Sequence, residues 1–216
     1  MKITWIGHSS FLIEDSHGIK LLTDPFDPSI GYSIYEGDAD IVTISHYHFD
    51  HDYIKGVKGN PIICDKVGDF NYCGITINGL PTFHDKVRGS KRGENIVYIW
   101  EMDGFRLCHL GDLGHTLLAE DIDKIGKIDV LFIPVGGNFT LDSSEASNVA
   151  KDIKSHIIIP MHYKTPLLSF PLAGVEDFLT EIKNGENINS SSLVITEKLE
   201  GYDKVKLFKV FKISNL

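Results

Sequence analysis

The chain has 216 residues, of which 42% are apolar and 24% are charged, a balance that is ordinary for a globular protein and excludes a disordered or fibrous one. Its 21 basic and 30 acidic side chains give a net charge of -9, which favours solubility and opposes non-specific attraction to nucleic acid or to an anionic membrane. We expect one domain spanning residues 1–216 with a full hydrophobic core.

The N-terminal sequence lacks the apolar stretch of about 7–15 residues that a signal peptide needs, and no apolar run approaches the ~20 residues of a membrane helix. We therefore expect a cytoplasmic protein with no membrane contact. Cys64, Cys73 and Cys108 are odd in number and have no CxxC spacing. They are expected to be buried free thiols rather than disulfides or zinc ligands.

Short runs with β character are most frequent in the first half of the chain, and most are bounded by Gly, Pro, Asn or Asp. Three segments, 116–125, 143–154 and 175–183, predict amphipathic helices, with Ser143 as an N-cap candidate, and the polar stretch 184–192 predicts a loop. This order of elements predicts an α/β protein with helices covering a sheet. The predicted strands lie at 2–6, 10–14, 19–23, 40–45, 61–64, 95–102, 105–111, 130–135, 156–160, 192–196 and 205–211.

The strongest functional signal is IVTISHYHFDHD, in which an apolar strand leads into His46, His48, Asp50 and His51. Alternate side chains of a strand point to the same face, so His46 and His48 can point together before the chain turns. Imidazole and carboxylate are ligands that zinc and similar divalent metals accept. Without a metal, four such clustered side chains would include costly unsatisfied polar groups, so the cluster predicts a metal site.

The HxHxDH sequence after an apolar strand resembles the signature of the metallo-β-lactamase-fold superfamily. TDP at residues 23–25 resembles the family's first motif, whose Asp, here Asp24, braces the metal loop. His84 in PTFHD, Asp112 in LCHLGDLGH and His162 in IIIPMHYKT resemble the later metal-binding positions, each after a β-like run. The resemblance covers the whole chain and implies a four-layer αββα sandwich with the site at one edge of its sheets.

The resemblance further implies a centre of two divalent metal ions, with zinc as the expected metal and manganese as the alternative. Two such ions lower the pKa of a bridging water and polarise the bond under attack. Asp50, as ligand and proton acceptor, and Asp112, as the shared carboxylate, are the implied catalytic residues. The implied ligands are His46, His48 and His84 for one metal, Asp50, His51 and His162 for the other, and Asp112 for both.

Three further histidines are candidates with weaker signals. His8 in WIGHSSFLIE resembles the GHS segment of the branch that includes ascorbate-6-phosphate lactonase, which implies a place in the substrate pocket. His115, in the loop beyond Asp112, is expected to contact substrate or a metal ligand, with a surface position at a helix start as the alternative. His109 competes with His84 as a ligand, but we expect it in the interior of a strand.

The segment HDKVRGSKRGEN places Lys86, Arg88, Lys91 and Arg92 in a loop that follows His84. A local positive field attracts phosphate or carboxylate whatever the net charge of the protein, although such a run is also typical of a solvated loop. Lys86 and Arg88 are the residues that we assign to substrate contact.

The sequence thus predicts a hydrolase that uses a metal-bridged hydroxide on a small anionic substrate containing a lactone, ester or phosphodiester bond. Flavodiiron-type relatives usually carry Glu at the position of His48, so hydrolysis is preferred to redox chemistry. One alternative is a nucleic-acid phosphodiesterase, which the net charge opposes. Another is a non-enzymatic, metal-stabilised binding module. Nothing in the sequence specifies an interface, so homo-oligomer formation stays open.

Overall fold

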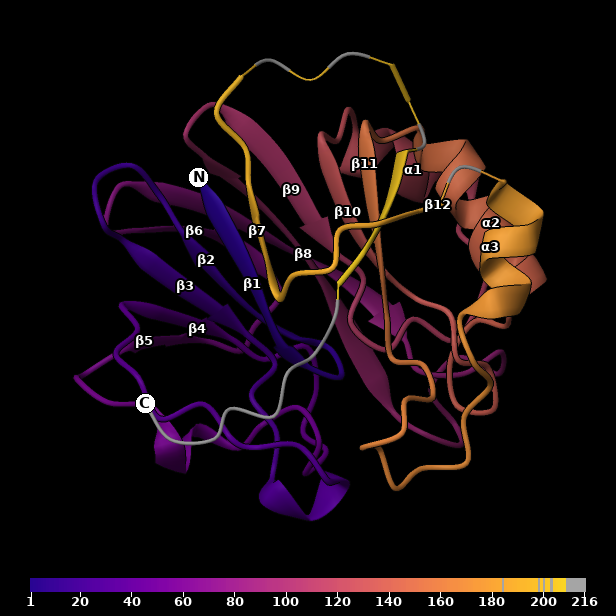
Figure 1. Ribbon diagram of the computed structural model, residues 1–216, viewed down its shortest axis with the longest axis horizontal. Coiled ribbons are helices and arrows are strands. Elements are labelled where there is room, and N and C mark those ends of the chain that lie inside the picture. The colour runs from indigo at the N-terminus through magenta and orange to yellow at the C-terminus, as the bar shows by residue number, and fades with distance from the viewer. Residues whose placement is uncertain (184, 198, 200, 203, 209–216) are drawn as a thin grey trace.

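Figure 1 shows the computed structural model of the chain, in which two β-sheets face each other and the helices lie along one side. The structure describes residues 1–183, 185–197, 199, 201–202 and 204–208. The helices within them are α1 (Ala119–Ile125), α2 (Ser143–Ile153) and α3 (Glu176–Ile182), with short 3₁₀ helices η1 (Pro28–Ile30) and η2 (Ile54–Gly56). The strands are β1 (Lys2–Gly7), β2 (Ser10–Glu14), β3 (Lys20–Thr23), β4 (Ile41–Thr43), β5 (Ile62–Cys64), β6 (Gly68–Tyr72), β7 (Ile75–Phe83), β8 (Glu94–Met102), β9 (Phe105–His109), β10 (Val130–Pro134), β11 (Ile157–Met161), β12 (Gly185–Asn187), β13 (Ser192–Val194) and β14 (Lys204–Leu207).

The strands form a six-stranded sheet in the order β13-β1-β2-β3-β4-β5 and an eight-stranded sheet in the order β12-β14-β11-β10-β9-β8-β7-β6. The main core lies between them. Because strand residues alternate between faces, Leu21 and Ile41 enter this core while their neighbours Leu22 and Val42 enter a second core on the outer face of the smaller sheet. The smaller sheet is therefore buried on both faces around β3 and β4.

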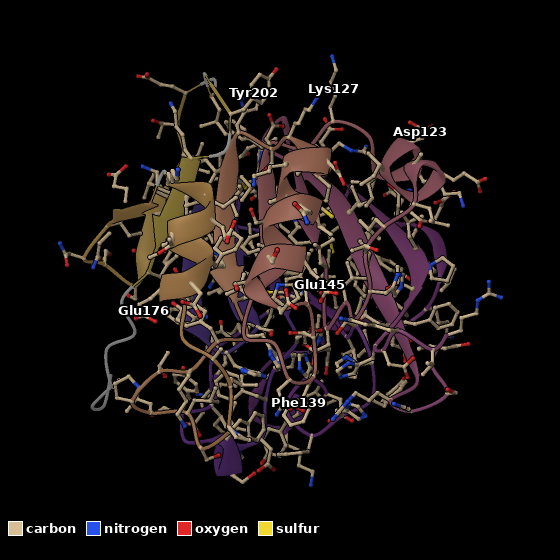
Figure 2. The ribbon with its side chains drawn as sticks, turned by 90° about the vertical axis from the view of Figure 1, so that its right-hand side faces the viewer. Asp123, Lys127, Phe139, Glu145, Glu176 and Tyr202 are labelled. Carbon is tan, nitrogen blue, oxygen red and sulfur yellow. The ribbon has the colours of Figure 1, made fainter. Side chains whose placement is uncertain are left out.

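The three α-helices cover the outer face of the larger sheet, at the right of Figure 1 and toward the viewer in Figure 2. They confirm the three predicted helices, although each is shorter than predicted. Asp142, and not the predicted Ser143, is the N-cap of α2, because its carboxylate accepts the Glu145 N–H at 2.9 Å in a capping box. Each described helix is too short or too polar to span a bilayer.

The outer face of the smaller sheet is covered by loops and by 3₁₀ helices. Phe26 and Tyr32 from the segment after β3, and Leu168 and Leu172 from the segment after β11, pack there in the second core. Two sheets and three helices confirm the predicted α/β sandwich, and over this sheet short 3₁₀ helices take the place of an α-helical layer.

The structure contains a hairpin made of β6 and β7, of which only a β-like run before His84 was predicted. Its turn residues Cys73 and Gly74 have φ of 52° and 80°, as in a type I′ turn, and Cys73 is exposed, so the expectation that it is buried was wrong. β7 pairs with β6 only as far as Gly79, and Pro81 lies beyond that point in β7. Its missing N–H therefore removes no ladder bond on that side.

The C-terminal part of the chain contains a strand where the sequence predicted a loop. β12 occupies part of the segment 184–192, which was predicted to be a loop, because it pairs in parallel with β14. Residue 184 lies outside the described residues. Of the predicted strand 205–211, residues 205–207 lie in β14, and 209–211 lie outside the described residues.

Candidate metal centre

Polar side chains from both sheets meet where several strands end. β1, β7 and β11 end directly before His8, His84 and His162, and the loops after β4 and β9 supply the remaining members. The residues brought together are His8, His46, His48, Asp50, His51, His84, Asp112 and His162, which include the whole ligand set implied by the resemblance.

The cluster divides into two sets of potential ligands, within each of which one donor atom per residue lies within 4.8 Å of the others. The first donor group is His46, His48 and His84, and the second donor group is His8, Asp50, His51 and His162. Asp112 lies between them. Its Oδ2 atom is 3.1 Å from Nε2 of His84 and 3.1 Å from Nε2 of His162, and its Oδ1 atom is 3.3 Å from Nε2 of His51.

These distances lie at the long end of the hydrogen-bond range and also match atoms directed at a shared metal ion. A charge-assisted N–H···O bond is about 2.7–2.9 Å long, whereas two ligands of a tetrahedral zinc ion, with bonds of about 2.0–2.1 Å, stand about 3.3–3.4 Å apart. All the separations around Asp112 exceed the first value. Nε2 of His46, His51 and His162 is buried and lacks a hydrogen-bond partner in the described part of the chain. The residues present therefore fit a metal centre.

Asp24 orients two of these histidines from outside the cluster. Its carboxylate accepts the Ser45 N–H at 2.8 Å and the Ser45 hydroxyl at 2.7 Å, and it accepts Nδ1–H of His51 at 2.9 Å. Oγ of Ser45 in turn lies 2.9 Å from Nδ1 of His46. Because Nδ1 of each ring is engaged, Nε2 is left for a metal, as outer partners of metal-binding histidines usually arrange. These contacts agree with the bracing role that the resemblance implies for Asp24.

The charges of the cluster favour a cation at its centre. Burial opposes ionisation of Asp112, yet the imidazoles of His162, His51 and His84 hold the pKa of its carboxyl well below the usual value. Burial likewise opposes a charge on His51, but the carboxylates of Asp112 and Asp50 raise its pKa well above the usual value. Two ionised carboxylates in a buried site thus stabilise a positive charge between them, whether a proton or a divalent ion carries it.

Two other histidines of the cluster are neutral at pH 7. Burial, reinforced by the neighbouring His51, lowers the pKa of His46 to about 2. Burial, reinforced by His162, lowers the pKa of His8 to about 4, although Asp50 opposes this shift. The neutral imidazole is the form that binds a metal, so no proton has to be removed from these rings on binding.

Three residues around the cluster have a left-handed backbone, which is uncommon outside glycine. They are His8 (φ 51°), Asp24 (φ 38°) and His162 (φ 52°), and each directly follows the last residue of a strand. Such a conformation costs about 1–3 kcal/mol per residue and persists only where the surroundings enforce it. The sharp turns direct all three side chains toward the same edge of the sandwich.

Asn95, which the sequence did not single out, holds the loop of Asp112 in place. Its Oδ1 accepts the Asp112 N–H at 2.9 Å, and its amide group donates to Leu110 O at 3.0 Å and to Thr82 Oγ1 at 2.7 Å. Gly111 fits here because its φ is +56° and a Cβ would lie 2.4 Å from Oδ1 of Asn95. An asparagine at the start of a strand reads as a turn residue, so no sequence signal marked it.

The cationic loop after His84 is organised by Asp85. Burial opposes ionisation of this carboxyl, but hydrogen bonds from four backbone N–H groups lower its pKa to about 2. Those N–H groups, at 2.8–2.9 Å, belong to Val87, Gly89, Lys91 and Arg92. The carboxylate therefore fixes the path of the loop and, with it, the direction of each cation.

The role of Lys86 and Arg88, the two residues assigned to substrate contact, stays a prediction. Lys86 pairs with Glu145 of α2 at 2.5 Å, and Arg88 is exposed. A pocket of about 450 Å³ lies beside the first donor group, and the cation of this loop that lines it with His46 and His48 is Arg92. The cation of this loop that lines the pocket is thus different from the two that were chosen on sequence alone.

The remaining candidate histidines are held by backbone groups. Nε2 of His115 accepts the Phe83 N–H at 3.2 Å, which fastens this loop to the end of β7 outside both donor groups. His109 is the buried last residue of β9, as expected for a strand position; its Nε2 donates to Ser9 O at 2.9 Å and its Nδ1 accepts the Gly111 N–H at 3.2 Å. With both nitrogens engaged, His109 has no donor atom left for a metal.

Comparison with known proteins agrees with this geometry. A family model described as a beta-lactamase superfamily domain matches residues 2–162. The chain belongs to the metallo-β-lactamase superfamily. Within this superfamily it is similar to the UPF0173 metal-dependent hydrolases: one from Archaeoglobus fulgidus is 31% identical over 85% of this chain and 91% of that protein, and one from Thermococcus kodakarensis is 32% identical over 76% and 85%.

A solved structure extends the similarity to the fold. A candidate Zn-dependent hydrolase of the metallo-β-lactamase superfamily from Thermotoga maritima superposes with a TM-score of 0.82 and 42% identity, covering 96% of this chain and 97% of that one. The present chain is therefore a member of a metal-dependent hydrolase family within the metallo-β-lactamase superfamily.

Proposed function

We propose that this hydrolase holds two divalent metal ions, zinc in the first place and manganese as the alternative, and cleaves a lactone, ester or phosphodiester bond in a small anionic substrate. The observation that carries the proposal is the pair of donor groups joined by one buried carboxylate, Asp112. A purely structural metal site would need only one closed set of ligands. The Zn-dependence ascribed to the similar Thermotoga maritima protein supports zinc here.

Bound in pairs, divalent ions lower the pKa of water and polarise the bond under attack. The side chains around them then have distinct tasks. Asp112 joins the two groups and supplies negative charge to both. Asp50 is our candidate for proton acceptor as well as ligand, because its Oδ2 atom lies at the junction of the second group, 3.2 Å from His8 Nε2 and 3.4 Å from His51 Nε2.

The pocket beside the first donor group supports an anionic substrate. Arg92 lines it, and its guanidinium stacks over the ring of Phe139 at 4.1 Å, which holds the charged group in one orientation. Lys66, Asp65 and Glu94 are the other charged residues that line the pocket, and Asp65 accepts the hydroxyl of Tyr47. A guanidinium presents a fork of N–H groups that matches carboxylate or phosphate. We therefore place the anionic group of the substrate at Arg92.

The test compares Arg92→Ala with the matched control Arg88→Ala, an exposed arginine of the same loop that does not line the pocket. The substrates are p-nitrophenyl acetate, which is neutral, and p-nitrophenyl hemisuccinate, which is anionic, with bis(p-nitrophenyl) phosphate for the phosphodiester reaction. Losing one charge-assisted contact, worth about 1.5 kcal/mol or more, should raise KM for the anionic ester about 10-fold and leave the neutral ester unchanged.

Equal effects on both esters, or equal effects of both variants, would exclude Arg92 from substrate recognition. The hydrolase itself is tested in the same assay with the wild-type protein. Turnover of at least one ester after loading with zinc or manganese, abolished by a chelator, supports the proposal. No turnover of any of the three substrates by fully loaded protein contradicts it.

A further inference from the structure

We propose that His8 is a further ligand of the second metal position, the one formed by the second donor group, in addition to Asp50, His51, His162 and the shared Asp112, and not a residue of the substrate pocket. This inference rests on the proposed two-metal centre and adds a ligand from β1 that the HxHxDH pattern and its companion motifs do not contain. The four residues of the second donor group, His8, Asp50, His51 and His162, are all buried, and each offers a donor atom within 4.8 Å of the others.

The distances around Asp50 are compatible with several side chains sharing one metal ion. Nε2 of His8 lies 3.2 Å from Oδ2 of Asp50, and Nε2 of His51 lies 3.4 Å from the same atom. The 3.2 Å contact is also within hydrogen-bond range. Both separations match the roughly 2.9–3.6 Å between two ligands at 90–120° on a zinc ion whose bonds are about 2.0–2.1 Å long. Nε2 of His8 and Nε2 of His51 therefore lie at similar distances from the same oxygen of Asp50.

The surroundings of His8 fit a ligand better than a substrate contact. Its side chain is 0% exposed, and its ring packs against His162 at 4.2 Å and against Phe170 at 5.7 Å between ring centroids. A fully buried ring offers a substrate no exposed surface in this structure. A metal held between His8, His51 and His162 needs no such surface.

The backbone presents His8 in the same way as it presents an expected ligand. β1 ends at Gly7, and His8 turns sharply with φ of 51°, as His162 does after β11 with φ of 52°. The carbonyl of His8 accepts the indole N–H of Trp5 at 3.0 Å, which fixes the turn. The strained conformation is thus enforced by local contacts, and it directs the imidazole into the cluster.

The additional ligand His8 makes the two metal positions unequal. The second position has His8, Asp50, His51 and His162 besides the shared Asp112, while the first has three histidines besides Asp112. The first position keeps more of its coordination sites open for water and substrate, and it also adjoins the pocket. The second position should bind its metal more tightly.

The test measures metal binding rather than turnover. His8→Asn suits the left-handed backbone, and His8→Gln keeps an amide that can reach Asp50. Wild type and both variants are loaded with Co²⁺, the two affinities are measured by chelator competition, and the visible absorption of bound Co²⁺ reports its coordination. His17→Gln is the control, since it removes the exposed Asp15, His17 and Asp103 group where adventitious metal would bind.

We expect wild type to bind about two equivalents. In both His8 variants one of the two Co²⁺ affinities should fall at least about 10-fold, which is the smallest loss usual when even a residue that only hydrogen-bonds a metal ligand is removed. The Co²⁺ spectrum should also change in these variants, and the control should match wild type. Folded variants with wild-type affinities and spectrum would overturn the role of His8 and leave the two-metal centre intact. Fewer than two equivalents in wild type would overturn the proposed centre itself.

Discussion

The two donor groups use the same side-chain chemistry but lie at different depths. In the first group His48 is only half-buried, and the group borders a pocket of about 450 Å³. In the second group every residue is buried, and the ring of Phe170 packs against His8. In the proposed two-metal centre the two positions are therefore not equivalent: the first borders the pocket, while the second is enclosed by the ends of strands.

The largest effect is expected from Asp112→Ala, because this carboxylate serves both groups. Both metal affinities should fall, and hydrolysis should fall about 10³-fold or more, since Lewis-acid stabilisation is worth several kcal/mol. Elemental analysis and ester hydrolysis measure the two losses. Asp123→Ala, on the exposed face of α1 in Figure 2, is the matched control. If Asp112→Ala still bound two equivalents tightly and kept nearly normal turnover, Asp112 would not be the carboxylate that joins the two donor groups.

A smaller effect is expected from Asp24→Ala, which acts on both groups from outside. It frees Nδ1 of His51 directly and loosens His46 through Ser45. Metal affinity should fall about 10- to 100-fold at each position, as is usual for outer partners of ligands. The buried donors left without an acceptor should also cost about 1–3 kcal/mol each in unfolding free energy. Chelator competition and denaturant titration measure these losses, and unchanged metal affinity would show that Asp24 does not orient the ligands.

The smallest effect is expected from Ser45→Ala, and it should separate the two groups. The variant removes the hydroxyl beside Nδ1 of His46 but leaves the contact of Asp24 with His51. Affinity at the first position should fall several-fold, a loss of about 1 kcal/mol for one hydrogen bond, and affinity at the second should stay unchanged. Thr140→Val, a buried hydroxyl loss elsewhere, is the control. Equal losses at both positions would contradict the assignment of Ser45 to the first group.

The parts of the site that could be predicted are those in which local pattern and motif agree. The strand before His46 and the HxHxDH spacing confine four donors to one short turn, so their proximity follows from the chain itself. His84, Asp112 and His162 could be added only through the resemblance, because their convergence depends on the register of strands that are distant in the sequence.

The parts that could not be predicted depend on long-range contacts or on side-chain direction. The sequence placed His8 in the substrate pocket, and that role stays a prediction. Its burial after the end of β1, with its ring 5.7 Å from that of Phe170, could not be read from the sequence. Arg92, and not Arg88, lines the pocket because of the turn around Asp85, which residue composition does not reveal. The hairpin at Cys73 escaped notice because its turn lacks the usual Asn-Gly or Asp-Gly pair.

The central claim, a two-metal centre with one enclosed and one open position, is tested most directly by titrating metal-free wild-type protein with Zn²⁺ while bound metal and hydrolysis of the anionic ester are recorded together. The account predicts uptake of about two equivalents. The ion taken up first binds more tightly, at the enclosed second position, and hydrolysis appears as the other ion fills the open first position. A folded protein that takes up no zinc, or one that hydrolyses the ester equally well without metal, would contradict it.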